Sequence, residues 1–386
     1  MNNTSINRKI INIHLYPSSF QNESRIEKIA HSIEKCKIFT DIVLIGTKES
    51  GIEPTRKIGK NTEIKLFGIS NLNYGIFYKM FVFIFWYISI LKYVLFRPIK
   101  CINVHSLSSL PLGVICKILK GSKLVYDTHE LETETISQSR FRKKFAKFIE
   151  KKLIPFSDHV FVVSESIASW YQEQYRIKRP TVVLNVPSIT KKQKFNIFRE
   201  KFPIKSSQKI LIYQGDLSYG RGVEILLNVF LKRDHNNCVV VFMGNGDLRE
   251  KIIKASNKST IIFFQNFVNP KNVYKYTASA DIGVALIENA CLSYYYCLPN
   301  KLFEYAMSGL PVIVSNVYEM AKLVESAENG VVTKCIGKEC FEAAIKDILS
   351  KNLTKLGLNS RKIAEKNSWN NQEKRIYEIY KKQLFS

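Results

Sequence analysis

Short apolar segments rich in β-branched residues alternate with segments of helical periodicity along most of the chain. This alternation is typical of parallel sheets that are covered by helices on both faces. In the first half, the predicted buried strands are 10–15, 41–45, 101–105, 124–127 and 160–164. In the second half, they are 210–214, 239–244, 261–264, 282–286 and 312–314. The pattern therefore predicts an α/β protein with two doubly wound domains, for which 386 residues are sufficient.

The boundary between the two domains is expected in the segment 187–208, which is polar, rich in lysine and without clear periodicity. We therefore predict a first domain at 1–186, a linker at 187–208 and a second domain at 209–368. The remaining segment, 369–386, has apolar residues at helical spacing and predicts a C-terminal helix.

The segment 80–91 carries no charged residue and departs from the surrounding pattern. A helix of this length measures about 18 Å, whereas a hydrocarbon core is about 30 Å thick. Extending it to 76–96 reaches a spanning length only by including Lys79 and Lys92. Three interpretations remain: a buried core helix, a helix in the plane of a membrane surface, and a transmembrane span. The aromatic and cationic flanks are typical of interfacial helices.

A second segment, Arg140–Leu153, predicts a basic amphipathic helix. Phe141, Phe145, Phe148 and Ile149 share one face, and seven lysines and arginines occupy most of the other positions. Such a helix suits an anionic membrane surface. The alternative is an ordinary surface helix whose phenylalanines pack on the sheet.

The net charge of +25 predicts an anionic partner, such as acidic lipid, a phosphorylated substrate or nucleic acid. Part of this charge reflects the general abundance of lysine. The eight cysteines show no metal-binding or CxxC spacing, so we expect reduced thiols. The polar segment 1–9 lacks the apolar region of a secretory signal, which predicts a cytoplasmic protein.

The segment 298–316 (LPNKLFEYAMSGLPVIVSN) predicts a helix that starts after Pro299 and ends before Gly309. Its first turn, at Asn300, offers free N–H groups and a positive dipole end to a phosphate. Lys301 and Glu304 are three residues apart and share one face of the helix. A cation and a carboxylate in this arrangement suit a ribose diphosphate, although such pairs are commonly exposed salt bridges.

Two further segments place chemical groups at the ends of predicted strands. The segment 214–222 (QGDLSYGRG) combines three glycines with Arg221, which could contact phosphate oxygens in a bidentate way. The segment 126–133 (YDTHELET) places Asp127, His129 and Glu130 after a strand of the first domain. Ligands of open parallel sheets bind at the carboxyl ends of strands, so these segments are candidate site loops.

Taken in order, these segments resemble glycosyltransferase family 4, over nearly the whole chain. The most specific element is PNKLFEY followed by GLPVI, and the YDTHE and QGDLSYGRG elements support it. The resemblance implies two Rossmann-like domains that face each other across a cleft, the GT-B fold, with a C-terminal helix at 369–386 that packs back on the first domain. It also implies a retaining transferase that uses a nucleotide-diphosphate sugar as donor.

The resemblance implies roles for individual residues. Glu304 would hold the ribose hydroxyls of the donor, and Arg221 and Lys301 would contact its diphosphate. Gly215 would let the diphosphate approach the backbone, and His129 would reach the sugar and the reacting phosphate.

The chain departs from the family pattern at several positions. Tyr296 stands eight residues before Glu304, where relatives often have another glutamate, and Glu288 in the preceding loop is a candidate for a sugar contact. Asp216 replaces an arginine of the family, and the loop 17–23 lacks the glycine pair that relatives often use. These departures concern the sugar and the acceptor more than the nucleotide.

The expected reaction passes through an oxocarbenium-like transition state, in which Arg221, Lys301 and the helix end at Asn300 stabilise the leaving diphosphate. No metal or cofactor is expected, because the chain has no cluster of aspartates suited to bridging a metal. The expected acceptor is a lipid-linked glycan of a cell-surface polysaccharide, at the inner face of the cell membrane. Two alternatives remain: a nucleotide-sugar epimerase of the same architecture, and a basic protein that binds lipid or nucleic acid and has a vestigial cleft.

Overall fold

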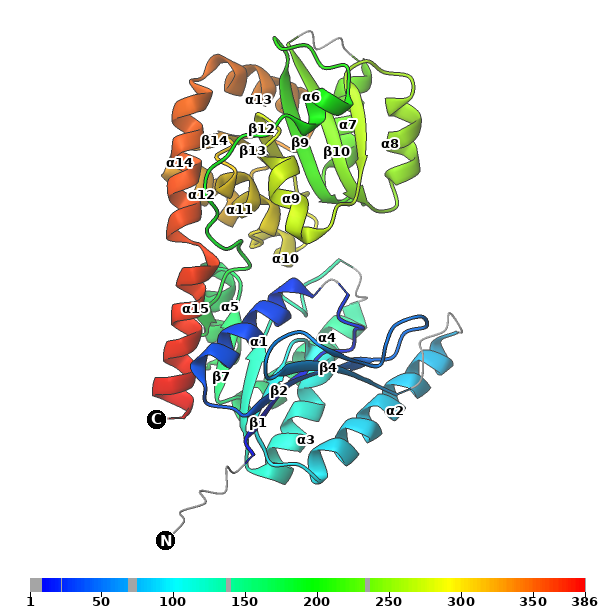
Figure 1. Cartoon of the computed structure of the whole chain (residues 1–386), viewed down its shortest axis with the longest axis vertical. Coiled ribbons are helices and arrows are strands. Elements are labelled where there is room, and N and C mark those ends of the chain that lie inside the picture. Colours follow the sequence, from blue (N-terminus) through cyan, green and yellow to red (C-terminus); the bar gives the residue numbers. More distant parts are fainter. Residues whose placement is uncertain (1–8, 22, 69–74, 137–139, 233–236, 386) are drawn as a thin grey trace. The chain divides into compact units, whose positions relative to one another are not determined.

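The computed structural model describes residues 9–21, 23–68, 75–136, 140–232 and 237–385. The chain forms two compact units, each with its own sheet (Figure 1). Unit 1 comprises Met1–Val183 and Gln372–Ser386, and unit 2 comprises Leu184–Asn371. Residues 1–8, on which the expected absence of a signal peptide depended, lie outside the described part.

Unit 1 is built around a mostly parallel sheet. Its strands are β1 (Ile11–Leu15), β2 (Asp41–Thr47), β3 (Thr55–Lys57), β4 (Thr62–Phe67), β5 (Ile99–Val104), β6 (Lys123–Asp127), β7 (His159–Val162) and β8 (Thr181–Val182). Its helices are α1 (Ser24–Cys36), α2 (Ile76–Leu95), α3 (Leu110–Lys120), α4 (Arg140–Leu153) and α5 (Glu165–Tyr175), with short 3₁₀ turns at Leu107–Ser109 and Ile154–Phe156.

The strand order in unit 1 is β3-β4-β2-β1-β5-β6-β7-β8, and β3 pairs with β4 in the antiparallel direction. The central strands β1 and β5 are almost entirely buried because both of their faces are covered, and they include the buried polar residues Asn12, His14 and Asn103. The short edge strands β3 and β8 were not predicted from the sequence. They have two or three residues, which is too short to show a hydrophobic period.

The end of the chain belongs to unit 1. The helix α15 (Trp369–Glu378) continues into π-helical turns at Ile379–Leu384. On this segment, Glu373 pairs with Lys35 of α1 at 2.8 Å, and the Tyr380 hydroxyl donates to the side-chain oxygen of Asn103. These contacts attach the C-terminal helix to the first unit.

Unit 2 has a parallel sheet in the order β11-β10-β9-β12-β13-β14. Its strands are β9 (Lys209–Asp216), β10 (Cys238–Asn245), β11 (Ile262–Asn266), β12 (Ile282–Ala285), β13 (Val312–Val314) and β14 (Gly330–Val332). Its helices are α6 (Ile197–Lys201), α7 (Val223–Lys232), α8 (Arg249–Ser256), α9 (Pro270–Thr277), α10 (Leu292–Tyr295), α11 (Asn300–Met307), α12 (Tyr318–Ala327), α13 (Lys338–Ser350) and α14 (Leu353–Lys366).

The segment 187–208, predicted to be a linker, belongs to unit 2 and is anchored to it at a few positions, although most of its residues are exposed. Phe198 on α6 is fully buried in the core of this unit. The guanidinium of Arg361 also donates to the carbonyl of Thr190. A few apolar anchors therefore fold this polar segment onto the unit, although the sequence around them shows no periodicity.

The helix α2 is not a core helix. Its buried residues Val82, Trp86, Ile90 and Val94 form a single stripe, and the indole N–H of Trp86 donates to the carbonyl of Gly46 at 2.8 Å. The window Tyr78–Leu95 has a mean hydropathy of 1.5 but is only 22% buried. Its length and composition would allow this helix to cross a membrane, but these two properties alone are weak evidence for a transmembrane span. The interpretation as a buried core helix therefore holds only for the stripe formed by these four buried residues.

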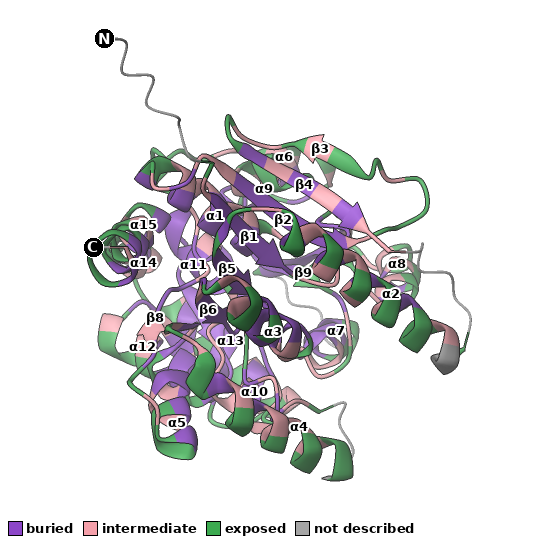
Figure 2. Ribbon diagram, turned by 90° about the horizontal axis from the view of Figure 1, so that it is seen from below, coloured by how far each residue is buried: buried purple, intermediate pink, exposed green. Residues whose placement is uncertain are grey.

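The phenylalanine face of α4 also points outward. Phe141, Phe145 and Phe148 are 80%, 59% and 57% exposed, so this face does not pack on the sheet. Instead, the buried carboxylate of Glu150 anchors the helix, accepting hydrogen bonds from the phenols of Tyr126 and of two tyrosines of α5 at 2.6–2.8 Å. Figure 2 shows exposed surface along α2 and α4.

Cys335 and Cys340 form a disulfide, which corrects the expectation that the cysteines are reduced. A turn brings their Cα atoms to 5.7 Å, and a spacing of five residues does not reveal such a turn in the sequence. Cys36, Cys101, Cys116 and Cys238 are buried free thiols, as expected for core cysteines.

Candidate active site

The helix α11 begins at the carboxyl edge of the sheet in unit 2. It spans Asn300–Met307, as predicted, and Gly309 follows it with a positive φ of 70°. The Tyr305 hydroxyl accepts the N–H of Gln214 at 3.1 Å and donates to the carbonyl of Val284 at 3.1 Å. Tyr305 thus fixes α11 against both β9 and β12. Asn300, in the first turn, is exposed and leaves this helix end open to a ligand.

Lys301 projects from α11 onto the end of β9. Its Nζ lies 3.7 Å from the centroid of the Tyr213 ring, and a Cβ added to Gly215 would lie 3.7 Å from the same nitrogen. Burial, followed by the positive charge of Arg221, lowers the pKa of Lys301 to about 7, whereas Glu304 and Asp216 oppose this shift. The three predicted site residues Arg221, Lys301 and Glu304 therefore act on one another at a single edge of unit 2.

Arg221 follows β9 in a glycine-rich loop. Its guanidinium lies 4.8 Å from the centroid of the Tyr294 ring. Gly222 has a φ of +69°, and a Cβ there would lie 2.2 Å from the Cβ of Leu286. Only glycine allows this close approach, which holds Arg221 beside the loop that follows β12.

Glu304 is held in place by two residues that the sequence analysis did not single out. Its Oε2 accepts a hydrogen bond from the side-chain amide of Gln214 at 2.5 Å. The amide oxygen of Gln214 accepts in turn from the hydroxyl of Thr277 at 2.6 Å. The position of Gln214 at the end of a buried strand was a usable signal, but Thr277 comes from α9, and only the tertiary structure brings it here.

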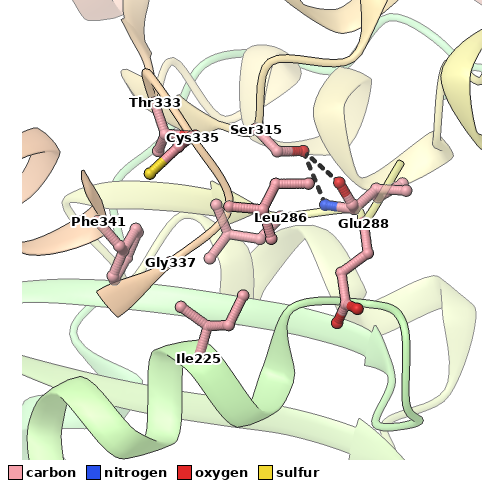
Figure 3. A pocket seen from close by; sticks show the side chains of 10 residues that line it. Ile225, Leu286, Glu288, Ser315, Thr333, Cys335, Gly337 and Phe341 are labelled. Atoms are coloured by element: carbon pink, nitrogen blue, oxygen red, sulfur yellow. Dashed lines mark hydrogen bonds between the residues drawn. The ribbon is translucent and has the colours of Figure 1, made fainter. Parts of the chain in front are cut away.

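Two positions noted as departures have local roles. The carboxylate of Asp216 accepts from the Ser218 hydroxyl at 2.5 Å. The N–H of Glu288 donates to the carbonyl of Gly220 at 3.1 Å, so its loop is tied to the loop of Arg221. Figure 3 shows Glu288 beside a small cavity, where the Ser315 hydroxyl bonds to the backbone of Ile287. This cavity is too small for a nucleotide and lies under the loop.

Unit 1 has a buried polar network centred on Asp127, at the end of β6. Arg25 of α1 pairs with its carboxylate at 2.5 Å and donates to the Val183 carbonyl at 2.6 Å. The Nδ1 of His105 lies 2.9 Å from the Asp127 carboxylate. Burial opposes ionisation, but Arg25 and the histidines keep the pKa of Asp127 well below its usual value.

The ionised Asp127 determines the tautomers of two buried histidines. Because the carboxylate accepts a proton, Nδ1 of His105 donates and its Nε2 accepts from Nδ1 of His14 at 2.8 Å. Burial lowers the pKa of both rings, so they are neutral at pH 7. Among the described residues, the Nε2 of His14 then has no hydrogen-bond partner. Asp127 therefore organises a hydrogen-bonded network, of which the sequence analysis identified only the part in the YDTHE motif.

His129 is the partly exposed member of this network. Its Nε2 lies 3.4 Å from the Asp127 carboxylate, and its ring packs 5.6 Å from that of Tyr16. His105, Asp127 and His129 also offer three atoms within 4.8 Å that could ligate a metal ion. The guanidinium of Arg25, however, already neutralises the carboxylate. The geometry favours an oriented histidine over a metal centre.

The fold, with two α/β units built on mostly parallel sheets, is that of the GT-B glycosyltransferases. The structure resembles sucrose-phosphate synthase from Thermosynechococcus elongatus with a TM-score of 0.81 and 15% identity, covering 97% of this chain and 98% of that one. It also resembles HepE of Anabaena, solved in complex with UDP and glucose, with a TM-score of 0.73 and 13% identity over 97% and 100% of the two chains. At these identities the likeness establishes the fold.

Two family models match successive parts of the sequence. The model described as Glycosyltransferase Family 4 matches residues 42–186, and the model described as Glycosyl transferases group 1 matches residues 194–369. The two models together span most of the chain, which therefore belongs to the group 1 / family 4 glycosyltransferases. This membership favours sugar transfer over the two alternatives, an epimerase and a basic binding protein.

Curated relatives are distant. An uncharacterized glycosyltransferase of Methanocaldococcus jannaschii is 25% identical over 48% of this chain and 47% of its own length. The chitobiosyldiphosphodolichol beta-mannosyltransferase of Kluyveromyces lactis is 25% identical over 64% of this chain and 61% of its own length. The chain thus spans about half to three-fifths of these relatives.

Proposed function

We propose that this protein transfers a sugar, with retention of configuration, from a nucleotide-diphosphate sugar to a lipid-linked glycan acceptor of a cell-surface polysaccharide. The observation that carries the proposal is the convergence of Arg221, Lys301 and Glu304 beside the Gly215 backbone. Two cations and an open helix end suit a diphosphate, and the carboxylate held by Gln214 suits the two hydroxyls of a ribose.

In the proposed reaction, the bond between the sugar C1 and the β-phosphate oxygen breaks, and negative charge accumulates on the diphosphate. An acceptor hydroxyl oxygen bonds to C1 on the same face, and its proton passes to the leaving diphosphate oxygen. Arg221, Lys301 and the N–H groups at Asn300 stabilise this charge without a metal. Preorganised donors of this kind contribute about 3–4 kcal/mol each. His129 of unit 1, oriented by Asp127, would position the sugar instead of acting as a general base.

The relatives support the choice of substrates. The Anabaena protein was solved with UDP and glucose, and the name of the yeast relatives refers to a sugar diphosphate linked to dolichol. We extend these two properties, a nucleotide donor and a lipid-linked acceptor, to this chain. An acceptor embedded in a membrane requires an enzyme that works at the membrane surface.

We also propose that unit 1 docks on an anionic membrane, at the inner face of the cell membrane. The helix α3 contacts both α2 and α4. The three helices expose apolar side chains, among them Phe81 and Phe85 on α2, Ile118 on α3 and Phe145 on α4. Exposed cations of α4 accompany these side chains, a combination that suits acidic headgroups.

Docking is tested by sedimentation with vesicles containing phosphatidylglycerol at low salt. The triple variant Phe141→Ser, Phe145→Ser, Phe148→Ser should lose most of the bound fraction, and Phe267→Ser, at an exposed position of unit 2, should not. A native protein that stays in the supernatant would disprove the membrane proposal and leave the transfer proposal intact.

Sugar transfer is tested by turnover with UDP- and GDP-sugars and a lipid-linked acceptor. Arg221→Ala should reduce kcat/KM by about a hundredfold or more. The matched control is Arg249→Ala, because Arg249 also lies over an aromatic ring of unit 2, 5.4 Å from Phe264. Near-normal turnover of Arg221→Ala would exclude the assigned role. Proton NMR of the product anomeric centre decides between retention and inversion.

A further inference from the structure

Three tyrosines cluster at the carboxyl edge of the sheet in unit 2. Tyr295 and Tyr296 follow β12, and Tyr318 follows the neighbouring strand β13. The ring centroids lie 5.3 Å apart for Tyr295–Tyr296, 6.0 Å for Tyr295–Tyr318 and 6.2 Å for Tyr296–Tyr318. We call these three residues the tyrosine cluster.

The tyrosine cluster is adjacent to the candidate diphosphate site. Tyr294, directly before it, lies under the guanidinium of Arg221 and near Gly220. Cys297, directly after it, contributes to the electrostatic surroundings of Lys301. The cluster is thus bracketed in sequence by two residues that face the two cations.

The cluster is not a buried core. Tyr318 is 44% exposed, and Tyr295 and Tyr296 are partly exposed. Aromatic rings that remain in water at a ligand-binding edge keep apolar area available for a ligand. The hexose ring of a nucleotide sugar has an apolar face of C–H groups, which matches a flat aromatic surface. The Nζ of Lys322 lies 5.7 Å from the centroid of the Tyr318 ring, at one side of the cluster.

We propose that the tyrosine cluster binds the pyranose ring of the donor sugar by stacking. The inference rests on the proposed function, because it assumes that Arg221 and Lys301 hold the donor diphosphate. In recognition by stacking, the aromatic rings contact the face of the sugar ring, so binding depends little on any single hydroxyl group of the sugar. A site that selects a sugar by hydrogen bonds, in contrast, rejects analogues that lack the bonded hydroxyl by about 10⁴-fold. The cluster therefore predicts tolerance for donors that lack one hydroxyl.

The experiment compares the affinity for a nucleoside diphosphate with that for its sugar derivative, by calorimetry without acceptor. The ligand pairs are UDP with UDP-glucose, and GDP with GDP-mannose. Tyr296→Leu and Tyr318→Leu should weaken binding of the sugar derivative by about five- to tenfold and leave the diphosphate affinity unchanged. Tyr296→Phe should retain native affinity, because the ring remains. Tyr377→Leu, at a 40% exposed position of unit 1, is the matched control.

The outcomes separate the two proposals. If neither diphosphate binds to the native protein, the proposed function fails and the stacking proposal fails with it. If the diphosphate binds and both leucine variants keep the native ratio of the two affinities, only the stacking proposal is overturned. If the leucine variants keep the native ratio in calorimetry and raise only the KM of the acceptor in the turnover assay, the cluster binds the acceptor ring, and the stacking proposal is likewise overturned. Tyr318→Leu keeps the test decisive if Tyr296→Leu fails to fold, because Tyr318 is the more exposed residue.

Discussion

The lowered pKa of Lys301 makes donor binding depend on pH. The side chain must be protonated to attract a diphosphate, and its pKa of about 7 lies well below the usual lysine value of 10.5. About half of the ligand-free molecules then carry this proton at pH 7, and about one-eleventh at pH 8. A bound diphosphate raises this pKa again, so binding above pH 7 takes up a proton. We therefore expect a constant affinity below about pH 6 and a loss of up to about tenfold per pH unit above pH 7.

The assay is calorimetric titration with a nucleotide sugar between pH 6 and 9, because its diphosphate keeps the same charge over this range. Measurements at pH 8.5 in buffers with different ionisation enthalpies should show an uptake of nearly one proton. Lys301→Arg should flatten the profile, since arginine stays protonated. Lys201→Arg is the matched control, because Lys201 also approaches an aromatic ring of unit 2, at 5.5 Å from Phe202. A native affinity that does not change with pH, with no proton uptake, would refute this reasoning.

Three further predictions concern stability, the diphosphate loop and metal dependence. Asp127→Asn should lower the free energy of unfolding in urea by about 3–5 kcal/mol, because it leaves the charge of Arg25 buried without its partner. Asp347→Asn, in an exposed pair, should change this free energy by less than about 1 kcal/mol. Equal losses of stability in the two variants would contradict this prediction. Gly215→Ala, at a φ of +111°, should weaken nucleotide-sugar binding by about tenfold or more in calorimetry, since the added methyl fills the space beside Lys301 and strains the backbone. Gly51→Ala, at a φ of +79° with open space around it, should be strained but bind normally. Turnover should persist in EDTA, and its abolition with recovery on adding a divalent cation would disprove the metal-independent mechanism.

Much of the fold could be predicted because apolar strands and helix signals are local. The helix α11 is bounded by Pro299 and Gly309, whose backbone preferences act wherever they occur, so its limits were predicted correctly. The edge strand β3 and the packing of Phe198 could not be predicted. The three residues of β3 are too few to show a hydrophobic period. Phe198 packs on residues that are distant in sequence, so its own segment does not reveal its burial.

The charged residues of the candidate site could be selected from the sequence, whereas the residues that hydrogen-bond to them could not. Arg221, Lys301 and Glu304 stood out because they lie in short motifs at a strand end and a helix start, whereas their convergence at one edge of unit 2 is seen only in the structure. Gln214 is a common polar residue, and nothing around it in the sequence indicates that it bonds to Glu304. The same holds for the network of His14, His105 and Arg25 around Asp127.

The sequence alone was sufficient to predict the two-sheet α/β architecture, the family and the charged side chains at the strand ends, because these follow from local preferences and short motifs. The tertiary structure decided which helix faces remain exposed on α2 and α4, that Cys335 and Cys340 are joined, and that tyrosines from two loops form one surface. Burial and side-chain pairing depend on which segments lie against each other. That is a property of the folded chain and not of any stretch of it.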